Sequence, residues 1–249
     1  MSSNSLITLI TGGNSGIGKC LAGLLVEDAN RHVIITSRSV DKGNAAVKEI
    51  EALSHPGKIE MMQLDLTRPE SITKLAKDVE RKYGRLDALV NNAAIGDFPE
   101  GISLSDRMQE SYRTNVTGPL LMLEAFWPLL MKSQTTPRVI NHSSGAGSLT
   151  VVNNMQDWPH GEVPIPYFCS KAGLNMVSAS WILAHKKDDY KLFTYCPGFT
   201  ESNLGPHNNQ ASGAQPVEKG ARPMVAILNG DKDAEHGKFL NHQGGQHPW

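Results

Sequence analysis

The chain has 249 residues, and a prior of about 150 residues per domain allows one domain or two. Hydrophobic residues make up 39% of the sequence, which excludes a disordered or collagen-like chain. The 24 basic and 25 acidic residues leave a net charge of −1, so the composition offers no basic surface for nucleic acid and no polybasic stretch for an anionic membrane. No apolar run reaches the ~18 residues that a membrane-spanning helix requires.

Short β-branched runs alternate with longer helical patterns along the chain. Strands are predicted at residues 6–11, 32–36, 59–64, 86–90, 138–141, 192–195 and 238–240. Helices are predicted at residues 16–29, 41–53 (with Asp41 as N-cap), 69–83, within 103–132, 167–185 and 217–228. This alternation predicts an α/β fold with a doubly wound parallel sheet of about seven strands and helices on both faces.

The cysteines and the first residues indicate the compartment. The 3 cysteines are odd in number and widely spaced, which does not suit a disulfide framework. The N-terminal residues lack the basic region of a secretory signal. We therefore expect a cytoplasmic protein.

No break in composition, low-complexity tract or repeat divides the sequence, so we expect residues 1–249 to form a single domain. Two segments are rich in loop-forming residues, at 145–166 and 202–215. Each follows a predicted strand, and open α/β sheets bind ligands at the carboxyl ends of their strands. We expect the ligand site to lie there.

A glycine-rich loop, TGGNSGIG at residues 11–18, joins the first predicted strand to the first predicted helix. Glycines let the backbone approach a pyrophosphate closely, and a helix N-terminus supplies free N–H groups and partial positive charge. The loop therefore predicts a dinucleotide-binding, Rossmann-type fold. An overlapping P-loop pattern has Cys20 where a hydroxyl should hold Mg²⁺, which disfavours a nucleoside triphosphatase but leaves it as an alternative.

The end of the second predicted strand indicates which dinucleotide binds. Folds that prefer NAD carry an acidic residue about 20 residues after the glycines, where it binds the ribose hydroxyl. Residues 36–39 read Thr-Ser-Arg-Ser, without an acid. Since the Arg38 guanidinium suits a 2′-phosphate, we predict NADP(H) rather than NAD.

Tyr167 and Lys171 are four residues apart at the start of a predicted helix, so their side chains share one face. A nearby ammonium lowers the pKa of a phenol. Such a tyrosine can protonate a carbonyl oxygen while a hydride reaches the carbon. Pairs with this spacing are also common by chance, so the pair gains weight only from the other motifs.

With these motifs the chain resembles the short-chain dehydrogenase/reductase family over nearly all of its length. The resemblance rests on the glycine loop at 11–18, Asn-Asn-Ala-Ala at 91–94, Ser-Ser-Gly at 143–145, the Tyr–Lys pair and Pro-Gly at 197–198, in family order. It implies an NADPH-dependent carbonyl reductase. Two departures are Ala94, where the family usually has glycine, and a longer separation than usual between Ser144 and Tyr167.

The resemblance also implies roles for individual residues. The implied catalytic residues are Asn115, Ser144, Tyr167 and Lys171, with Ser143 as the alternative to Ser144. The implied cofactor-binding residues are Gly12, Asn14, Ser15, Gly16, Ile17, Gly18, Arg38, Asp65, Leu66, Asn92, Ala93, Tyr167, Lys171, Pro197, Gly198, Thr200 and Ser202. In this assignment Tyr167 donates the proton, Lys171 lowers its pKa and binds the nicotinamide ribose, and Asn115 holds a water in the proton relay.

The expected reaction is hydride transfer from NADPH to a ketone or aldehyde, or the reverse oxidation of an alcohol. The resemblance implies a homodimer or homotetramer, with a substrate loop at 202–215. The insertion at 150–164, with Trp158, Pro159 and His160, either covers the substrate pocket or lies on the surface, and we favour the pocket because it joins two catalytic segments. The alternative function is an NADP(H)-binding sensor or scaffold without redox turnover.

Two other kinds of site are disfavoured. A Ser-His-Asp hydrolase of the α/β type requires a G-x-S-x-G turn, and the sequence has none. His236, His242 and His247 occur in a glycine-rich tail without a cluster of acids or cysteines, so no metal is expected. The sequence leaves open whether this tail packs at the pocket or at a contact between subunits.

Overall fold

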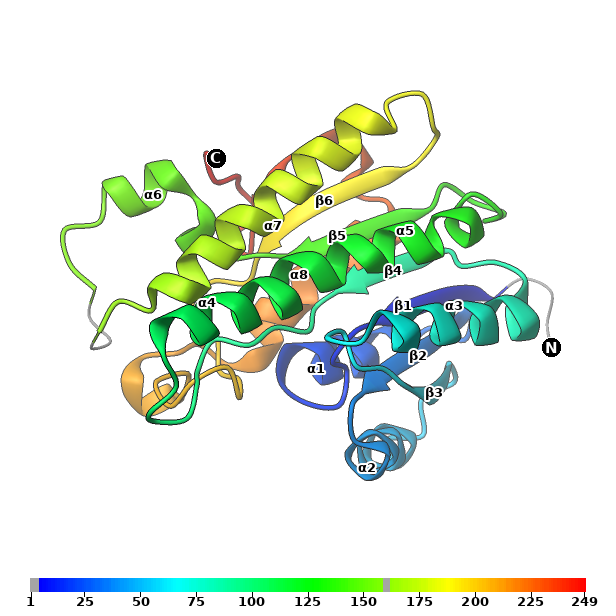
Figure 1. The fold of residues 1–249 in the computed structure, drawn as a ribbon. Helices are drawn as coiled ribbons and strands as arrows, with labels where there is room; N and C mark the ends of the chain where they lie inside the picture. The colour runs from blue at the N-terminus through cyan, green and yellow to red at the C-terminus, as the bar shows by residue number, and fades with distance from the viewer. Residues whose placement is uncertain (1–4, 159–161) are drawn as a thin grey trace.

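The computed structural model describes residues 5–158 and 162–249, and Figure 1 shows a single sheet between layers of helices. The strands are β1 (Leu6–Ile10), β2 (Arg31–Ser37), β3 (Lys58–Gln63), β4 (Ala88–Asn91), β5 (Arg138–His142), β6 (Lys191–Cys196) and β7 (Phe239–Asn241). The α-helices are α1 (Gly16–Leu25), α2 (Val40–Glu51), α3 (Pro69–Tyr83), α4 (Leu104–Tyr112), α5 (Gly118–Leu130), α6 (Leu149–Asn153), α7 (Ile165–Ala184) and α8 (Val217–Asn229). The predicted α/β architecture is confirmed.

All strand pairs of this seven-stranded sheet are parallel, in the order β3-β2-β1-β4-β5-β6-β7. The chain runs outward from β1 to β3, and then returns to place β4 on the other side of β1. Loops that leave the carboxyl ends of β1 and β4 therefore diverge, which opens a crevice between them. This reversal of strand order is where doubly wound sheets bind ligands.

The two faces of the sheet carry separate apolar cores. Helices α1, α2 and α8 cover one face, while α3, α5 and α7 cover the other, with α3, α4, α5 and α7 in front of the sheet in Figure 1. The central strands are continuous apolar runs because side chains on both faces are buried. Within the described part of the chain, no helix has both the length and the apolar character needed to cross a bilayer.

Helix α2 begins before the predicted position. Its N-cap is Ser39, whose Oγ accepts a hydrogen bond from the Lys42 N–H at 3.3 Å, so the assignment of Asp41 as the N-cap is wrong. Asp41 lies instead in the first turn, where its negative charge interacts favourably with the helix dipole.

The long helix predicted within residues 103–132 is divided in the structure. A π-helical segment, Arg113–Thr117, separates α4 from α5. Segments of this kind are rare and frequently mark functional sites. This one contains Asn115, and it places the side chain of that residue against α7.

Candidate active site

A large cavity lies at the carboxyl ends of the strands, with a volume of ≈ 1260 Å³. Its walls come from the loops after β1, β2, β4, β5 and β6, from the start of α7 and from the C-terminal tail. Small-molecule sites usually measure about 300–1,000 Å³, so this cavity has room for a dinucleotide together with a second small molecule.

The predicted site residues converge on this cavity, although they lie between positions 12 and 202 of the sequence. Those that line it are Gly12, Asn14, Ser15, Gly16, Ile17, Arg38, Asp65, Leu66, Asn92, Ala93, Ser144, Tyr167, Lys171, Pro197, Gly198, Thr200 and Ser202. Gly18 and Asn115 are not among the lining residues. A Cβ atom on Gly18 would lie 2.4 Å from Asn92 Nδ2, so this glycine allows α1 to pack closely against the β4 loop.

The glycine loop presents backbone rather than side chains to the cavity. Gly12 has φ +64°, and a Cβ atom there would lie 2.9 Å from that of Ala93, so a side chain would be both strained and crowded. Ser15 is the N-cap of α1 but forms no side-chain capping bond. The first N–H groups of α1 therefore have no side-chain cap and fit the negative charge of a pyrophosphate.

Two basic side chains line the cavity where β2 ends. Arg38 is exposed there, and its guanidinium forms no ion pair within the described residues. Lys42 lines the same part of the cavity from the first turn of α2. Lys42 was not predicted from the sequence, although it lies in the first turn of the helix that follows Arg38. Together they provide positive charge suited to a phosphate.

Asp65, which the resemblance assigns to the cofactor, lies in the loop after β3. Its Oδ1 accepts hydrogen bonds from the Thr67 N–H at 3.0 Å and the Thr67 hydroxyl at 2.7 Å. Burial acts to raise the pKa of this carboxyl, but the two hydrogen bonds outweigh it and the pKa is lowered. Asp65 is therefore a rigidly held carboxylate on the cavity wall.

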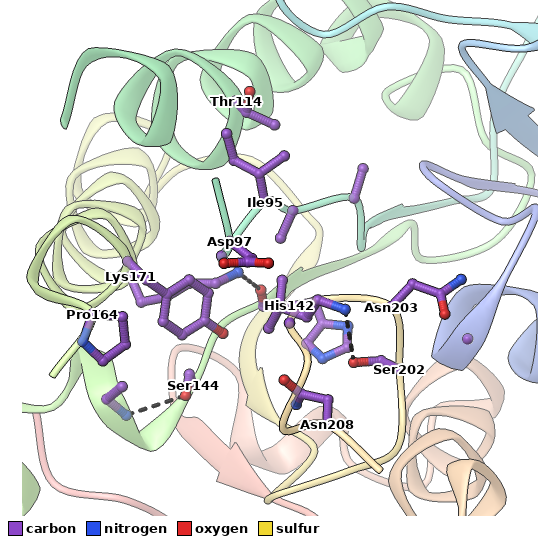
Figure 2. Close-up of a pocket in the computed structure, with 18 of the residues that line it drawn as sticks. Ile95, Asp97, Thr114, His142, Ser144, Pro164, Lys171, Ser202, Asn203 and Asn208 are labelled. Carbon is purple, nitrogen blue, oxygen red and sulfur yellow. Dashed lines mark hydrogen bonds between the residues drawn. The ribbon is translucent and has the colours of Figure 1, made fainter. Parts of the chain in front are cut away.

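Tyr167 and Lys171 lie on the same face of α7, with the Lys171 Nζ 5.5 Å from the centre of the Tyr167 ring. Lys171 is buried, and its Nζ donates a hydrogen bond to the His142 carbonyl at 2.8 Å, as Figure 2 shows. Burial lowers the pKa of Lys171 to about 8. The helix therefore places a phenol and a weakened ammonium side by side on the cavity wall.

The pKa of the Tyr167 phenol is raised, not lowered as the spacing from Lys171 predicted. Burial dominates, and a hydrogen bond with Ser144 opposes it only in part. The phenol therefore keeps its proton in the protein without ligands. A retained proton is what a proton donor requires.

The structure separates the two adjacent serines. Ser143 is 1% exposed, and its Oγ donates to Asn175 Oδ1 at 2.6 Å, which commits the hydroxyl to the interior. The Ser144 hydroxyl lies beside the Tyr167 phenol, whose pKa it acts to lower, and it accepts the Ala146 N–H at 3.2 Å. A hydroxyl that binds a substrate oxygen has to face the cavity beside the proton donor, so this geometry favours Ser144.

Asn115 lies behind the cavity wall and is 1% exposed. Its Oδ1 accepts from the Ile95 N–H at 2.9 Å, and its Nδ2 donates to the Ile95 carbonyl at 2.8 Å and to Ser170 Oγ at 3.0 Å. These bonds tie the loop after β4 to α7, next to Lys171. The side chain thus positions the wall, and the predicted link through a water stays a prediction.

The insertion and the loop after β6 form a further part of the cavity wall. From the insertion, the lining includes Met155, Trp158 and Val163, and the Trp158 ring packs edge-to-face on Phe168 with ring centres 5.1 Å apart. Pro159 and His160 lie outside the described residues. Residues 202–208 of the predicted substrate loop also line the cavity.

Charged side chains join this wall from the loop after β4 and from α4. Asp97 points into the space in front of Lys171 in Figure 2, and Arg107 lines the cavity from α4. The Arg107 Nε is buried and has no hydrogen-bond partner among the described residues. Neither residue was predicted from the sequence, because isolated charges in loops and helices carry no pattern.

The C-terminal tail packs at the cavity rather than away from it. His242 and His247 line the cavity, and Trp249 stacks on Phe239 with ring centres 5.4 Å apart. Ser148 Oγ donates to the Pro248 carbonyl at 2.6 Å, which joins the tail to the start of the insertion. Residues 5–158 and 162–249 contain no group of three or more His, Cys, Asp or Glu side chains arranged to hold a metal ion.

Comparisons with known proteins agree with this geometry. The family model described as short chain dehydrogenase matches residues 6–213. The short-chain dehydrogenase/reductase tropE of Talaromyces stipitatus is 33% identical over 264 residues, which cover 99% of each chain. The (+)-neomenthol dehydrogenase of Arabidopsis thaliana is 31% identical over 88% of this chain and 90% of that protein.

Among solved structures, the NADPH-bound carbonyl reductase from chicken fatty liver superposes with a TM-score of 0.83. It is 29% identical in sequence, and the match covers 99% of this chain and 100% of that one. The family match covers most of the chain, and it includes the glycine loop, the Tyr–Lys pair and strands β1 to β6. The chain therefore belongs to the short-chain dehydrogenase family of oxidoreductases.

Proposed function

We propose that the protein transfers a hydride from NADPH to the carbonyl carbon of a ketone or aldehyde, with Tyr167 as the proton donor. The observation that carries this proposal is the pairing of the protonated Tyr167 phenol with the Ser144 hydroxyl in a cavity of dinucleotide size. The reverse reaction oxidises the corresponding alcohol.

The glycine loop, the end of β2 and the start of α2 form one side of the cavity, which we call the nucleotide side. Its residues fit NADPH, which would supply the hydride when bound. The uncapped N-terminus of α1 would hold the pyrophosphate. Arg38 and Lys42 would hold the 2′-phosphate, whose charge distinguishes NADP(H) from NAD(H). The NADPH-bound carbonyl reductase of similar fold supports this assignment.

The chain's own residues handle the proton. Tyr167 donates its phenolic proton to the carbonyl oxygen as negative charge develops there, and Ser144 donates a hydrogen bond to the same oxygen. The Lys171 ammonium stabilises the tyrosinate left behind, because an opposite charge nearby favours the ionised form. The products are the alcohol and NADP⁺, so the hydride and the proton are both accounted for.

An NADP(H)-binding sensor or scaffold without turnover is the competing function. Such a protein needs the nucleotide side of the cavity but has no use for a proton donor. Here Ser144, Tyr167 and Lys171 all line the cavity together. This convergence supports catalysis over a purely binding role.

The test is NADPH oxidation against a panel of aldehydes, aliphatic ketones and bulky aromatic ketones. We expect turnover with at least one class, and Tyr167→Phe should lower kcat by about a thousandfold, with unchanged affinity for NADPH. Tyr112→Phe is the matched control, because its hydroxyl bonds to the Cys169 carbonyl and it does not line the cavity. Tight NADPH binding without oxidation by any carbonyl would instead establish the scaffold function.

A further inference from the structure

His142 is a buried side chain on the cavity wall that the proposed mechanism does not use. It is the last residue of β5, and it is 8% exposed. Its ring lines the cavity beside Lys171, as Figure 2 shows. An imidazole in this position has two nitrogens, and each has to be accounted for.

The hydrogen bonds of Asn92 fix the proton on one of these nitrogens. Asn92 Nδ2 donates to the carbonyls of Thr11 at 2.8 Å and Gly12 at 3.3 Å, so the amide orientation is set. Its Oδ1 lies 3.0 Å from His142 Nδ1 and can only accept. His142 Nδ1 therefore carries a hydrogen and donates it.

The ring is neutral, so its second nitrogen bears a free lone pair. Burial and, to a lesser extent, the nearby Lys171 ammonium lower the pKa of His142 to about 3. With the hydrogen on Nδ1, a neutral imidazole has an unprotonated Nε2, which can only accept a hydrogen bond.

No described residue occupies this acceptor. Lys171 Nζ bonds to the backbone carbonyl of His142 rather than to its ring. The Tyr195 ring packs edge-on at 6.0 Å, but its hydroxyl donates to the Gly220 carbonyl. Nε2 is also not among the buried atoms that lack a partner, so it is accessible from the cavity.

We propose that His142 Nε2 accepts a hydrogen bond from an O–H or N–H group of a ligand in this cavity, and that His142 is therefore a binding residue of the site. The inference rests on the proposed function, because the nucleotide and its carbonyl substrate are the ligands that would bring such a group. A lone pair repels phosphate, carboxylate and carbonyl oxygens, so the group at this point is a hydroxyl or an amide N–H.

Two substitutions of His142 distinguish the roles of its two ring nitrogens. In His142→Asn, the amide nitrogen takes the position of Nδ1 and still donates to Asn92, but nothing replaces Nε2. In His142→Gln, the longer side chain carries an amide oxygen to the position of Nε2. The asparagine variant therefore removes only the proposed acceptor, and the glutamine variant restores it.

The measurements are the Kd of NADPH without substrate and the KM of a carbonyl substrate at saturating NADPH. We expect His142→Asn to raise either the Kd of NADPH or the KM of the substrate by about tenfold. We expect His142→Gln to bring the affected constant most of the way back to the wild-type value. A higher Kd assigns the donor to the nucleotide, and a higher KM with unchanged Kd assigns it to the substrate. In nitrogen-labelled wild-type protein, the Nε2 resonance should have the shift of an unprotonated nitrogen and move when that ligand binds.

Three outcomes would overturn the inference. His142→Asn could leave both constants unchanged, or His142→Gln could lose as much affinity as His142→Asn, in which case the ring and not its acceptor matters. The wild-type Nε2 resonance could also stay fixed on saturation with NADPH and substrate. Wild-type protein that binds no NADPH at all would contradict the proposed function as well, whereas the first three results leave that function intact.

Discussion

The two sides of the cavity are built in different ways. The nucleotide side consists of short loops that leave β1, β2 and β4, and each loop carries its own recognisable residues, at 12–17, 38–42 and 92–93. The reaction side combines β5, α7, the loop after β6 and the tail, which are far apart in sequence. The nucleotide side can therefore be recognised segment by segment, while the reaction side exists only after folding.

The two sides also treat charge differently. Arg38 and Lys42 are exposed basic side chains on the cavity wall, where they suit an anion. On the reaction side, burial lowers the pKa values of His142 and Lys171 and raises that of Tyr167. Each shift favours the neutral form of its group, as desolvation requires. One side presents exposed positive charge, while burial shifts the titratable groups of the other side toward their neutral forms.

On the reaction side, the largest expected effect is the difference in kcat between alanine substitutions of the adjacent serines Ser143 and Ser144. Ser144→Ala should lower kcat by about a hundredfold, because the carbonyl oxygen loses a hydrogen bond in the transition state. Ser143→Ala should instead lower the free energy of unfolding by about 1–3 kcal/mol, since Asn175 Oδ1 loses its donor. Steady-state kinetics and thermal unfolding of both variants make each the control for the other, and the opposite ranking in kcat would assign the role to Ser143.

Arg38→Asp tests the nucleotide side. We expect the Kd for NADPH to rise by about fiftyfold and the Kd for NADH to change little, because only NADPH carries the phosphate that Arg38 would bind. Binding titrations with both nucleotides measure the ratio. Lys48→Asp, an exposed charge reversal in α2 away from the cavity, is the control. An unchanged ratio would show that the discrimination lies elsewhere.

The smallest expected effect is a pH-dependent change in the free energy of unfolding, and it is due to Lys171. Lys171 has a pKa of about 8 in the folded protein, against 10.5 for an ordinary lysine. Between these values the unfolded chain binds more protons, so the stability of the wild type rises with pH across this window. Below pH 8 both states are protonated, and the full cost of the buried ammonium is present.

Lys171→Met removes that cost. At pH 7 we expect the variant to be more stable than the wild type by about 2 kcal/mol, after allowing for the lost bond to the His142 carbonyl. The difference should shrink as the pH approaches 10. Thermal unfolding at both pH values measures it, with exposed Lys187→Met as the control. A difference independent of pH would mean that desolvation does not govern this side chain.

Predictions from the sequence were most accurate where the signal is local. The strands were recognised from their apolar runs, and the glycine loop from residues that follow one another directly. Errors arose where neighbours in space decide. The N-cap of α2 is Ser39 rather than the predicted Asp41, because the Ser39 hydroxyl accepts the Lys42 N–H. The predicted long helix is interrupted by a π-helical segment at Asn115, whose side chain bonds to the loop after β4.

The sequence by itself determined the sheet, the family, the glycine loop and the identity of Arg38, Tyr167 and Lys171 as residues of one site. Tertiary structure alone decided that Ser144 rather than Ser143 has its hydroxyl beside Tyr167, that His242 and His247 line the cavity, and that His142 directs a free lone pair into it. The physical reason is that hydrogen-bond partners and desolvation are set by the neighbours of a group in space. For His142 the decisive partner, Asn92, is 50 positions away along the chain.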